Sequence, residues 1–216
     1  MSMDMIVYIQ SFENITVKDY EAYLRQFAMQ AKIQSDMHFD VHTSGFFPFK
    51  VEFPNIESLK TGKFISGFEF YVDDYDYVQE LTELQEMNES YKVKVKKEKK
   101  KFSFFGKMTA SIREDSIKTS KMNFIMNEEA DGILKQCKHR INLVAHGLSE
   151  ETMVYAAASY LAEVGKGVIS DPQLDVDYYS DISQKMTVRI KESINALSLG
   201  VMHPWEEDLS KHKGGK

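Results

Sequence analysis

Apolar side chains recur every three or four positions in several segments of the chain, which is the spacing of one helix face. We therefore predict helices over residues 16–34, 75–88, 128–138, 149–164 and 182–197. Thr16 is the predicted N-cap of the first helix, because a threonine hydroxyl accepts from the free amides of a first turn. The residues expected to face inward are Tyr20, Leu24, Phe27 and Ala31; Val78, Leu81 and Leu84; Met153, Ala157, Tyr160, Leu161 and Val164; and Met186, Ile190, Ile194 and Leu197.

Other segments consist of short apolar runs or alternate apolar with polar residues, a pattern that predicts strands. The predicted strands cover residues 5–10, 37–43, 46–53, 64–72, 91–105, 140–145 and 168–169. Pro48 favours an edge position or a bend for its strand, because proline has no amide hydrogen for a ladder bond. In the strand over 64–72 one face is apolar and the other carries Glu69 and Tyr71. Residues 109–127 are ambiguous, with 120–126 as a further strand candidate.

The order of these elements predicts an α+β fold, with a mixed or antiparallel sheet flanked by several helices. Strands precede and separate the helices without the strict alternation of a doubly wound sheet. We expect a single domain over residues 1–205, followed by a polar, glycine-rich tail over 206–216 that frays. Two tightly packed lobes are the alternative, with a seam near Gly106, where a lysine-rich stretch ends.

The segment from Ser149 to Pro172 organises this prediction. Ser149 is the expected N-cap of its helix, and Gly165 and Gly167 supply the backbone freedom that ends it. The apolar pair 168–169 is typical of a buried strand, and Asp171-Pro172 is typical of a turn.

Composition restricts the function classes. Hydrophobic residues make up 43% of the 216 residues, enough for a sizeable core, and no apolar run is long enough to span a bilayer. The net charge of −6 disfavours general nucleic-acid binding. Cys137 is the lone cysteine, which excludes an internal disulfide and favours a reducing compartment. The N-terminal residues lack the pattern of a secretory signal, so we expect a cytoplasmic protein. No motif calls for a cofactor.

The strongest charge feature is an acidic run between Phe64 and Glu89, which holds eight carboxylates and neither lysine nor arginine. An acidic surface attracts a basic protein partner and forms charge-assisted hydrogen bonds with it. A solvated helix face is the alternative interpretation. The predicted partner-binding residues are Asp73, Asp74, Asp76, Glu80, Glu83 and Glu86.

The next segment reverses the charge, with seven lysines between Lys92 and Lys101. Lysines at alternate strand positions protect an exposed sheet edge. They also suit pairing with the neighbouring acidic run. Phosphate or RNA binding is a further interpretation, which the acidic balance of the whole chain disfavours.

A candidate metal site is formed by His38, Asp40 and His42, which share one face of the strand predicted over 37–43. No other histidine or cysteine lies close in sequence to complete the site. We therefore expect these residues to form the solvent-exposed face of a half-buried strand, and we predict no bound metal. This triad is the basis of an alternative function, a metal-dependent enzyme. A self-associating structural or phage-related protein is a third hypothesis.

General acid–base chemistry has weaker candidates in His139 and His146, which flank the strand over 140–145. The chain contains no nucleophile motif, no phosphate-binding glycine loop and no His-Glu-x-x-His pair. Nearby positive charge favours reactivity of Cys137, but a lone helical cysteine is usually an inert packing residue. We therefore predict no catalytic residue.

The segment from Arg140 to Gln173 resembles a pattern found in bacterial immunity proteins of polymorphic toxin systems. A strand ends near a histidine in 141–146, an alanine-rich helix follows in 155–162, and a strand runs into Asp-Pro-Gln in 167–173. This chain continues with Leu174-Asp175, where a glycine is more typical of the turn. The resemblance implies a cytoplasmic, non-enzymatic protein that binds and blocks a cognate toxin, and a basic nuclease toxin suits the acidic run. It implies no individual site residue.

Overall fold

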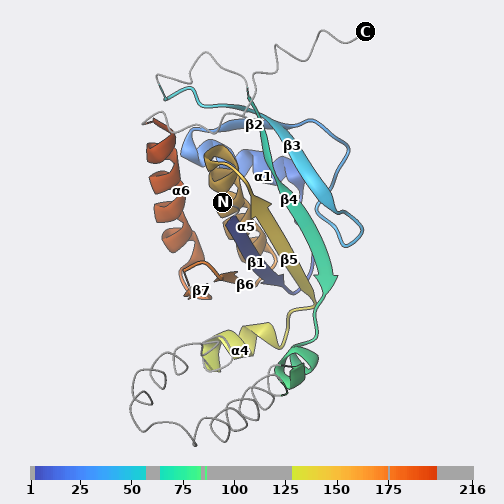
Figure 1. The fold of residues 1–216 in the computed structure, drawn as a ribbon. Coiled ribbons are helices and arrows are strands. Elements are labelled where there is room, and N and C mark those ends of the chain that lie inside the picture. Colours follow the sequence, from blue (N-terminus) through green and yellow to red (C-terminus); the bar gives the residue numbers. More distant parts are fainter. Residues whose placement is uncertain (1–2, 57–63, 84–85, 87–127, 175, 199–216) are drawn as a thin grey trace, which may run out of the picture.

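A seven-stranded antiparallel sheet forms the centre of the molecule (Figure 1). The computed structural model describes residues 3–56, 64–83, 86, 128–174 and 176–198. The strand order is β2-β3-β4-β5-β1-β6-β7, and every pair is antiparallel. This arrangement confirms the predicted α+β class. The strands are β1 (Met3–Ile9), β2 (Gln30–Ile33), β3 (Gly45–Glu52), β4 (Phe64–Asp74), β5 (His139–Ala145), β6 (Val168–Asp171) and β7 (Val176–Tyr178).

The larger helices pack on one face of this sheet. Helix α5 (Leu148–Val164) contacts β1, β4, β5 and β6, and α1 (Val17–Leu24) and α6 (Ile182–Ser198) pack against α5. Every α5 residue from Thr152 to Ala162 is buried. An alanine-rich helix suits this position, because short side chains allow neighbouring elements to approach closely on all sides.

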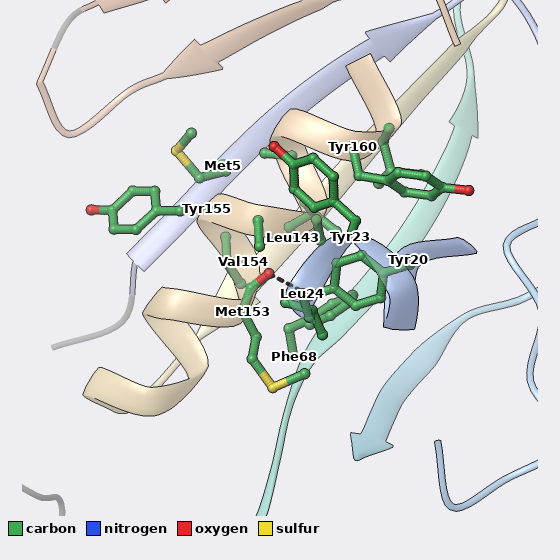
Figure 2. Close-up of a cluster of buried hydrophobic side chains, with 14 of the residues drawn as sticks. Met5, Tyr20, Tyr23, Leu24, Phe68, Leu143, Met153, Val154, Tyr155 and Tyr160 are labelled. Carbon is green, nitrogen blue, oxygen red and sulfur yellow. Dashed lines mark hydrogen bonds between the residues drawn. The ribbon is translucent and has the colours of Figure 1, made fainter. Parts of the chain in front are cut away.

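The main core lies between α5 and the sheet. Alternate residues of each strand point into it, such as Met5, Val7 and Ile9 of β1. Tyr20 of α1 is fully buried among aromatic rings, and its hydroxyl donates to the Met153 carbonyl oxygen at 2.8 Å (Figure 2). That bond satisfies the one polar atom that this large side chain brings into the core.

A smaller cluster occupies one end of the opposite face, where β4 ends and β5 begins. Tyr8 packs there with Leu134 of α4 (Glu128–Leu134), with Val168 and with Cys137. Residues 77–83 form a helix that reaches the same cluster through Tyr75 and Tyr77. Figure 1 shows α4 and this helix together at the bottom of the view. Two helical segments therefore meet near the end of β4, where Asp73 and Asp74 of the acidic run lie.

The first helix is shorter than predicted. The Thr16 cap is confirmed, since its hydroxyl accepts from the Asp19 amide at 3.0 Å, but α1 ends at Leu24 instead of residue 34. A short 3-10 turn, η1 (Arg25–Phe27), follows, and Ala28 then adopts a left-handed backbone with φ of 57°. Residues 30–33 become β2 because they pair with β3, a contact between segments that helical periodicity does not record.

The strand predicted over residues 37–43 is absent, and the chain forms bends and a turn there. The Asp40 carboxylate accepts from the His42 amide at 2.8 Å and from the Thr43 hydroxyl at 3.0 Å. These local bonds replace strand pairing, as is typical of aspartate in turns. Phe39 is nevertheless buried, so the alternation reflects one anchored aromatic side chain.

Pro48 lies in β3, which has neighbours on both sides and is not an edge strand. Its carbonyl accepts from the Gln34 amide, just beyond the last β2 pair. In an antiparallel strand the nitrogen and carbonyl of one residue point to the same side. Pro48 therefore faces Gln34, and this pair keeps one of its two possible bonds, at the position where β2 ends.

The ends of α5 differ from the prediction. Its N-cap is Gly147, whereas Ser149 lies buried and shares a 2.8 Å hydrogen bond with Ser66 of β4. At the other end α5 stops at Val164 with Gly165 as its C-cap, as predicted, but Lys166 rather than a glycine carries a positive φ, of 54°. Gly167 is needed for close packing, because an added Cβ would lie 1.8 Å from the Tyr8 carbonyl oxygen.

Several predictions hold and others lie outside the described residues. The helix over 128–138 forms as α4 but ends at residue 134, and α6 buries Met186, Ile190 and Leu197 as expected. Strand β7 was not among the predicted strands. The assignments outside the described residues are those for 91–105, 109–127 and 206–216, the lysine stretch and the seam near Gly106.

Candidate partner-binding surface

Most of the acidic run lies at the end of β4 and in the helix that follows it. Asp73 and Asp74 are exposed at the end of this strand. Asp76 then starts the helix over 77–83, and its carboxylate accepts from the Val78 amide at 2.8 Å and from the Gln79 amide at 3.1 Å. An aspartate cap satisfies free amides and also suits the positive end of the helix dipole. Asp76, one of the predicted partner-binding residues, is therefore also the N-cap of this helix.

Glu80 serves as a docking residue for this helix. It is half-buried and accepts a hydrogen bond from the Tyr8 hydroxyl of β1 at 3.5 Å. Burial, and secondly the nearby Glu80 charge, raise the pKa of Tyr8. The pKa of Tyr75 is also raised, first by burial and secondly by its hydrogen bond to Glu80. Two tyrosine hydroxyls therefore share one carboxylate, which anchors the helix to the sheet.

The inward face of the helix is rotated from the predicted one. Val78 is 68% exposed, although the spacing placed it inward with Leu81. Tyr77 points inward instead, where the Lys135 ammonium lies 5.4 Å from its ring centroid. Aromatic and charged contacts with α4 decide the orientation, so apolar periodicity is a poor guide here. The acids left on the exposed side are Asp74, Asp76, Glu83 and Glu86.

Asp73 lies beside a positive charge. Its carboxylate is 3.0 Å from the Arg140 guanidinium of β5, and 51% and 40% of the two side chains are exposed. The hydrogen bond to Asp73 raises the pKa of Arg140, whereas burial opposes this. Exposed pairs of this kind contribute about 0–1 kcal/mol. Asp73 is therefore partly neutralised, and the other exposed acids carry more of the negative potential.

Helix α4 brings further carboxylates to the same end of the sheet. Glu128 and Glu129 are exposed in its first turn, which favours negative charge. Sequence reasoning missed them because they lie far from the acidic run along the chain. We call the set of exposed acids at this end the acidic platform; it consists of Asp74, Asp76, Glu83, Glu86, Glu128 and Glu129. Lys135 and Lys138 are exposed beside it.

No protein-family model, curated protein or solved structure matches this chain. The segment that resembles immunity proteins forms β5, α5 and β6. Its Asp171 is 2% exposed, accepts from the Gln173 and Leu174 amides, and lies 3.8 Å from the Arg189 guanidinium of α6. The Asp-Pro-Gln sequence therefore has a structural role here, since it closes a turn and ties α6 to the sheet.

The His38, Asp40 and His42 triad does not form the predicted geometry. Its residues lie in the bends and turn described above, with both histidines exposed. Burial favours a higher pKa for the Asp40 carboxyl. Hydrogen bonds from the His42 amide and the Thr43 hydroxyl outweigh this effect and lower the pKa of Asp40. Across the described parts of the chain, no three histidine, cysteine or acidic side chains gather as a metal site would require.

A cluster that the sequence did not reveal surrounds His146 at the start of α5. Its Nε2 atom is 3.3 Å from a Glu69 carboxylate oxygen, and its amide donates to the buried Glu150 at 2.7 Å. Burial raises the pKa of Glu150. Two surface hollows, of about 530 Å³ and about 720 Å³, are lined by other residues. Neither hollow therefore provides a substrate site beside His146. The bonds of this cluster instead fix the turn between β5 and α5.

Cys137 belongs to the smaller cluster, whereas His139 packs against Phe12 beside the main core. Cys137 is buried, and burial raises the pKa of its thiol to about 12. Burial lowers the pKa of His139, because it favours the neutral imidazole; the His139 ring centroid lies 5.2 Å from that of Phe12. The thiol therefore stays protonated in spite of the nearby lysines.

Among the described helices, none combines the length and the apolar character of a bilayer span.

Proposed function

We propose that this chain is a non-enzymatic, immunity-protein-like inhibitor that neutralises a cognate bacterial toxin in the cytoplasm by covering its functional surface. The observation that carries the proposal is the acidic platform, which gathers carboxylates from β4, the helix over 77–83 and α4 at one end of the sheet. The toxin class comes from the resemblance of residues 140–173. The lone cysteine supports a reducing compartment.

The platform is held in place before any partner arrives. Asp76 caps the helix over 77–83, and Glu80 anchors it to Tyr8 and Tyr75. A carboxylate on a fixed element loses less side-chain freedom on binding than one on a loose loop. Exposed Val78 lies among these acids and offers apolar area to the same partner. Binding therefore combines long-range attraction of a basic surface with local burial.

The first experiment is co-purification with this chain as bait in its native host, followed by mass spectrometry. A basic protein retained at one-to-one stoichiometry, and harmless to cells only when this chain is co-expressed, supports the inhibitor proposal. A chain that retains no other protein and forms a homo-oligomer contradicts it and favours the self-associating hypothesis.

The platform is tested with the retained protein once it has been purified. Replacing Asp74 and Glu83 by lysine is expected to weaken binding at least tenfold at low salt and to reduce its salt dependence. Asp36→Lys is the matched control, because Asp36 is equally exposed but lies in the bend before Phe39. Equal affinity of the wild type and the double variant would remove the platform from the interface.

A further inference from the structure

The outer face of the sheet, on the side away from α5, carries two rows of side chains defined by the strand register. In the first row Phe46 of β3 lies opposite Glu69 of β4, which lies opposite Val144 of β5. In the next row Tyr71 of β4 lies opposite Asn142 of β5. Phe46 and Tyr71 are therefore diagonal neighbours that flank Glu69, about 7–8 Å apart by typical antiparallel spacing.

Two aromatic rings are exposed on this face. Phe46 and Tyr71 are each 40% exposed, whereas their chain neighbours Phe47 and Phe70, which point to α5, are fully buried. Within the described residues, α4 and the helix over 77–83 cover only the far end of the outer face, around Tyr8. Exposed aromatic side chains at the middle of a polar surface are characteristic of protein interfaces.

Both rings are held in position by the sheet itself. The Phe46 ring lies over Gly67 of β4, where an added Cβ would be 2.9 Å from the ring edge. The Tyr71 hydroxyl donates to the Glu69 carboxylate at 2.9 Å. Glu69 also lies 3.3 Å from the His146 ring. The two rings and the carboxylate between them thus form a preorganised group, which lowers the entropy lost on binding.

The charges around this group indicate the chemistry of its partner. Asp4 is exposed and lies opposite Val144 in the first row, and Asp73 continues the outer face toward the acidic platform. Arg140 is the basic residue of β5 on this face, and it already pairs with Asp73. Close to the rings, the acids Asp4, Glu69 and Asp73 outnumber Arg140, whereas Lys50 lies farther along β3 on the same face. This part of the outer face therefore complements a basic partner rather than a second acidic copy of this chain.

We infer that the outer face is the centre of the partner interface, with Phe46 and Tyr71 as its anchors and the acidic platform as its charged rim. An arginine or lysine of the partner stacks on an exposed ring face beside Glu69, where the ring attracts a cation and Glu69 accepts its hydrogen bonds. This inference rests on the proposed function, and it names the residues that determine specificity. Anchors at the centre of an interface contribute more affinity than charges at its rim.

The test compares Phe46→Ala and Tyr71→Ala with Val188→Ala, in binding to the purified basic protein that the wild type retains. Val188 is 53% exposed on α6, so it controls for the loss of an exposed apolar side chain. We expect Kd to rise about 30-fold or more for each aromatic variant at all salt concentrations, and less than twofold for the control. Unfolding in urea checks that all three variants remain folded.

The outcomes separate this inference from the proposed function. If the lysine variants of the platform weaken binding while Phe46→Ala and Tyr71→Ala bind as the wild type does, the outer face is not the interface and the inhibitor proposal stands. If the wild type retains no protein and Phe46→Ala dissociates a homo-oligomer, both are overturned. Loss of affinity in the aromatic variants alone supports the outer face as the central contact.

Discussion

Removal of the Tyr20 hydroxyl tests the link between α1 and α5. The hydroxyl is fully buried and donates to the Met153 carbonyl oxygen at 2.8 Å (Figure 2). Tyr20→Phe keeps the ring contacts with Phe39, Phe49 and Phe68, whose centroids lie 5.7, 5.6 and 6.0 Å away. A buried hydrogen bond contributes about 0.5–1.5 kcal/mol, and an orphaned partner adds to the loss. We expect the free energy of unfolding to fall by about 1–2 kcal/mol.

Urea unfolding of the full chain, followed by circular dichroism, measures this difference. An unchanged m-value is required, because it shows that the native and unfolded states expose the same surface as in the wild type. Tyr71→Phe is the control, since its hydroxyl bond to Glu69 lies on an exposed face and is expected to contribute less than about 0.5 kcal/mol. Equal losses in the two variants would refute the reasoning from burial.

Three further predictions concern Cys137, His139 and the end of α5. Cys137 should react with a thiol reagent at about pH 8 much more slowly in the native protein than in the urea-unfolded chain, because burial raises its pKa and covers the sulfur; equal labelling rates would contradict this. His139 has a lowered pKa, so the unfolded chain binds more protons near pH 6 and stability should fall as the pH drops through the unfolded value of 6.5. His139→Leu should flatten that dependence in urea titrations at several pH values, and an unchanged slope counts against it. Gly167→Ala should lower the melting temperature strongly, because its Cβ would lie 1.8 Å from the Tyr8 carbonyl oxygen, whereas Gly132→Ala, with open space around it, should not.

Part of the candidate surface was predictable, because consecutive acids in a short segment end up at one end of the sheet. The exposed positions of Asp74 and Asp76 follow from this alone. The role of Glu80 does not, since its tyrosine partner Tyr8 lies 72 positions away in β1. Sequence spacing likewise treats Val78 as a core residue, although α4 and Tyr77 determine which side of that helix faces inward.

The alternation within a strand that creates the outer face was predictable from the sequence, but the set of residues that share this face was not. Alternation in residues 64–72 correctly placed Glu69 and Tyr71 on one face of a strand. That Phe46 joins them depends on the pairing of β3 with β4, and that Val144 joins them depends on the pairing of β4 with β5. No local pattern encodes a strand register between segments so far apart along the chain.

The sequence by itself determined the fold class, the Thr16 cap, most strands, and the helices that became α5 and α6, because those features follow from periodicity and from bonds between near neighbours. Tertiary structure alone decided where the first helix stops, which way the helix over 77–83 faces, and which acids and aromatic rings share a surface. Those outcomes depend on strand pairing and on packing between distant segments. There, contacts with the rest of the chain outweigh local propensities of well under 1 kcal/mol per residue.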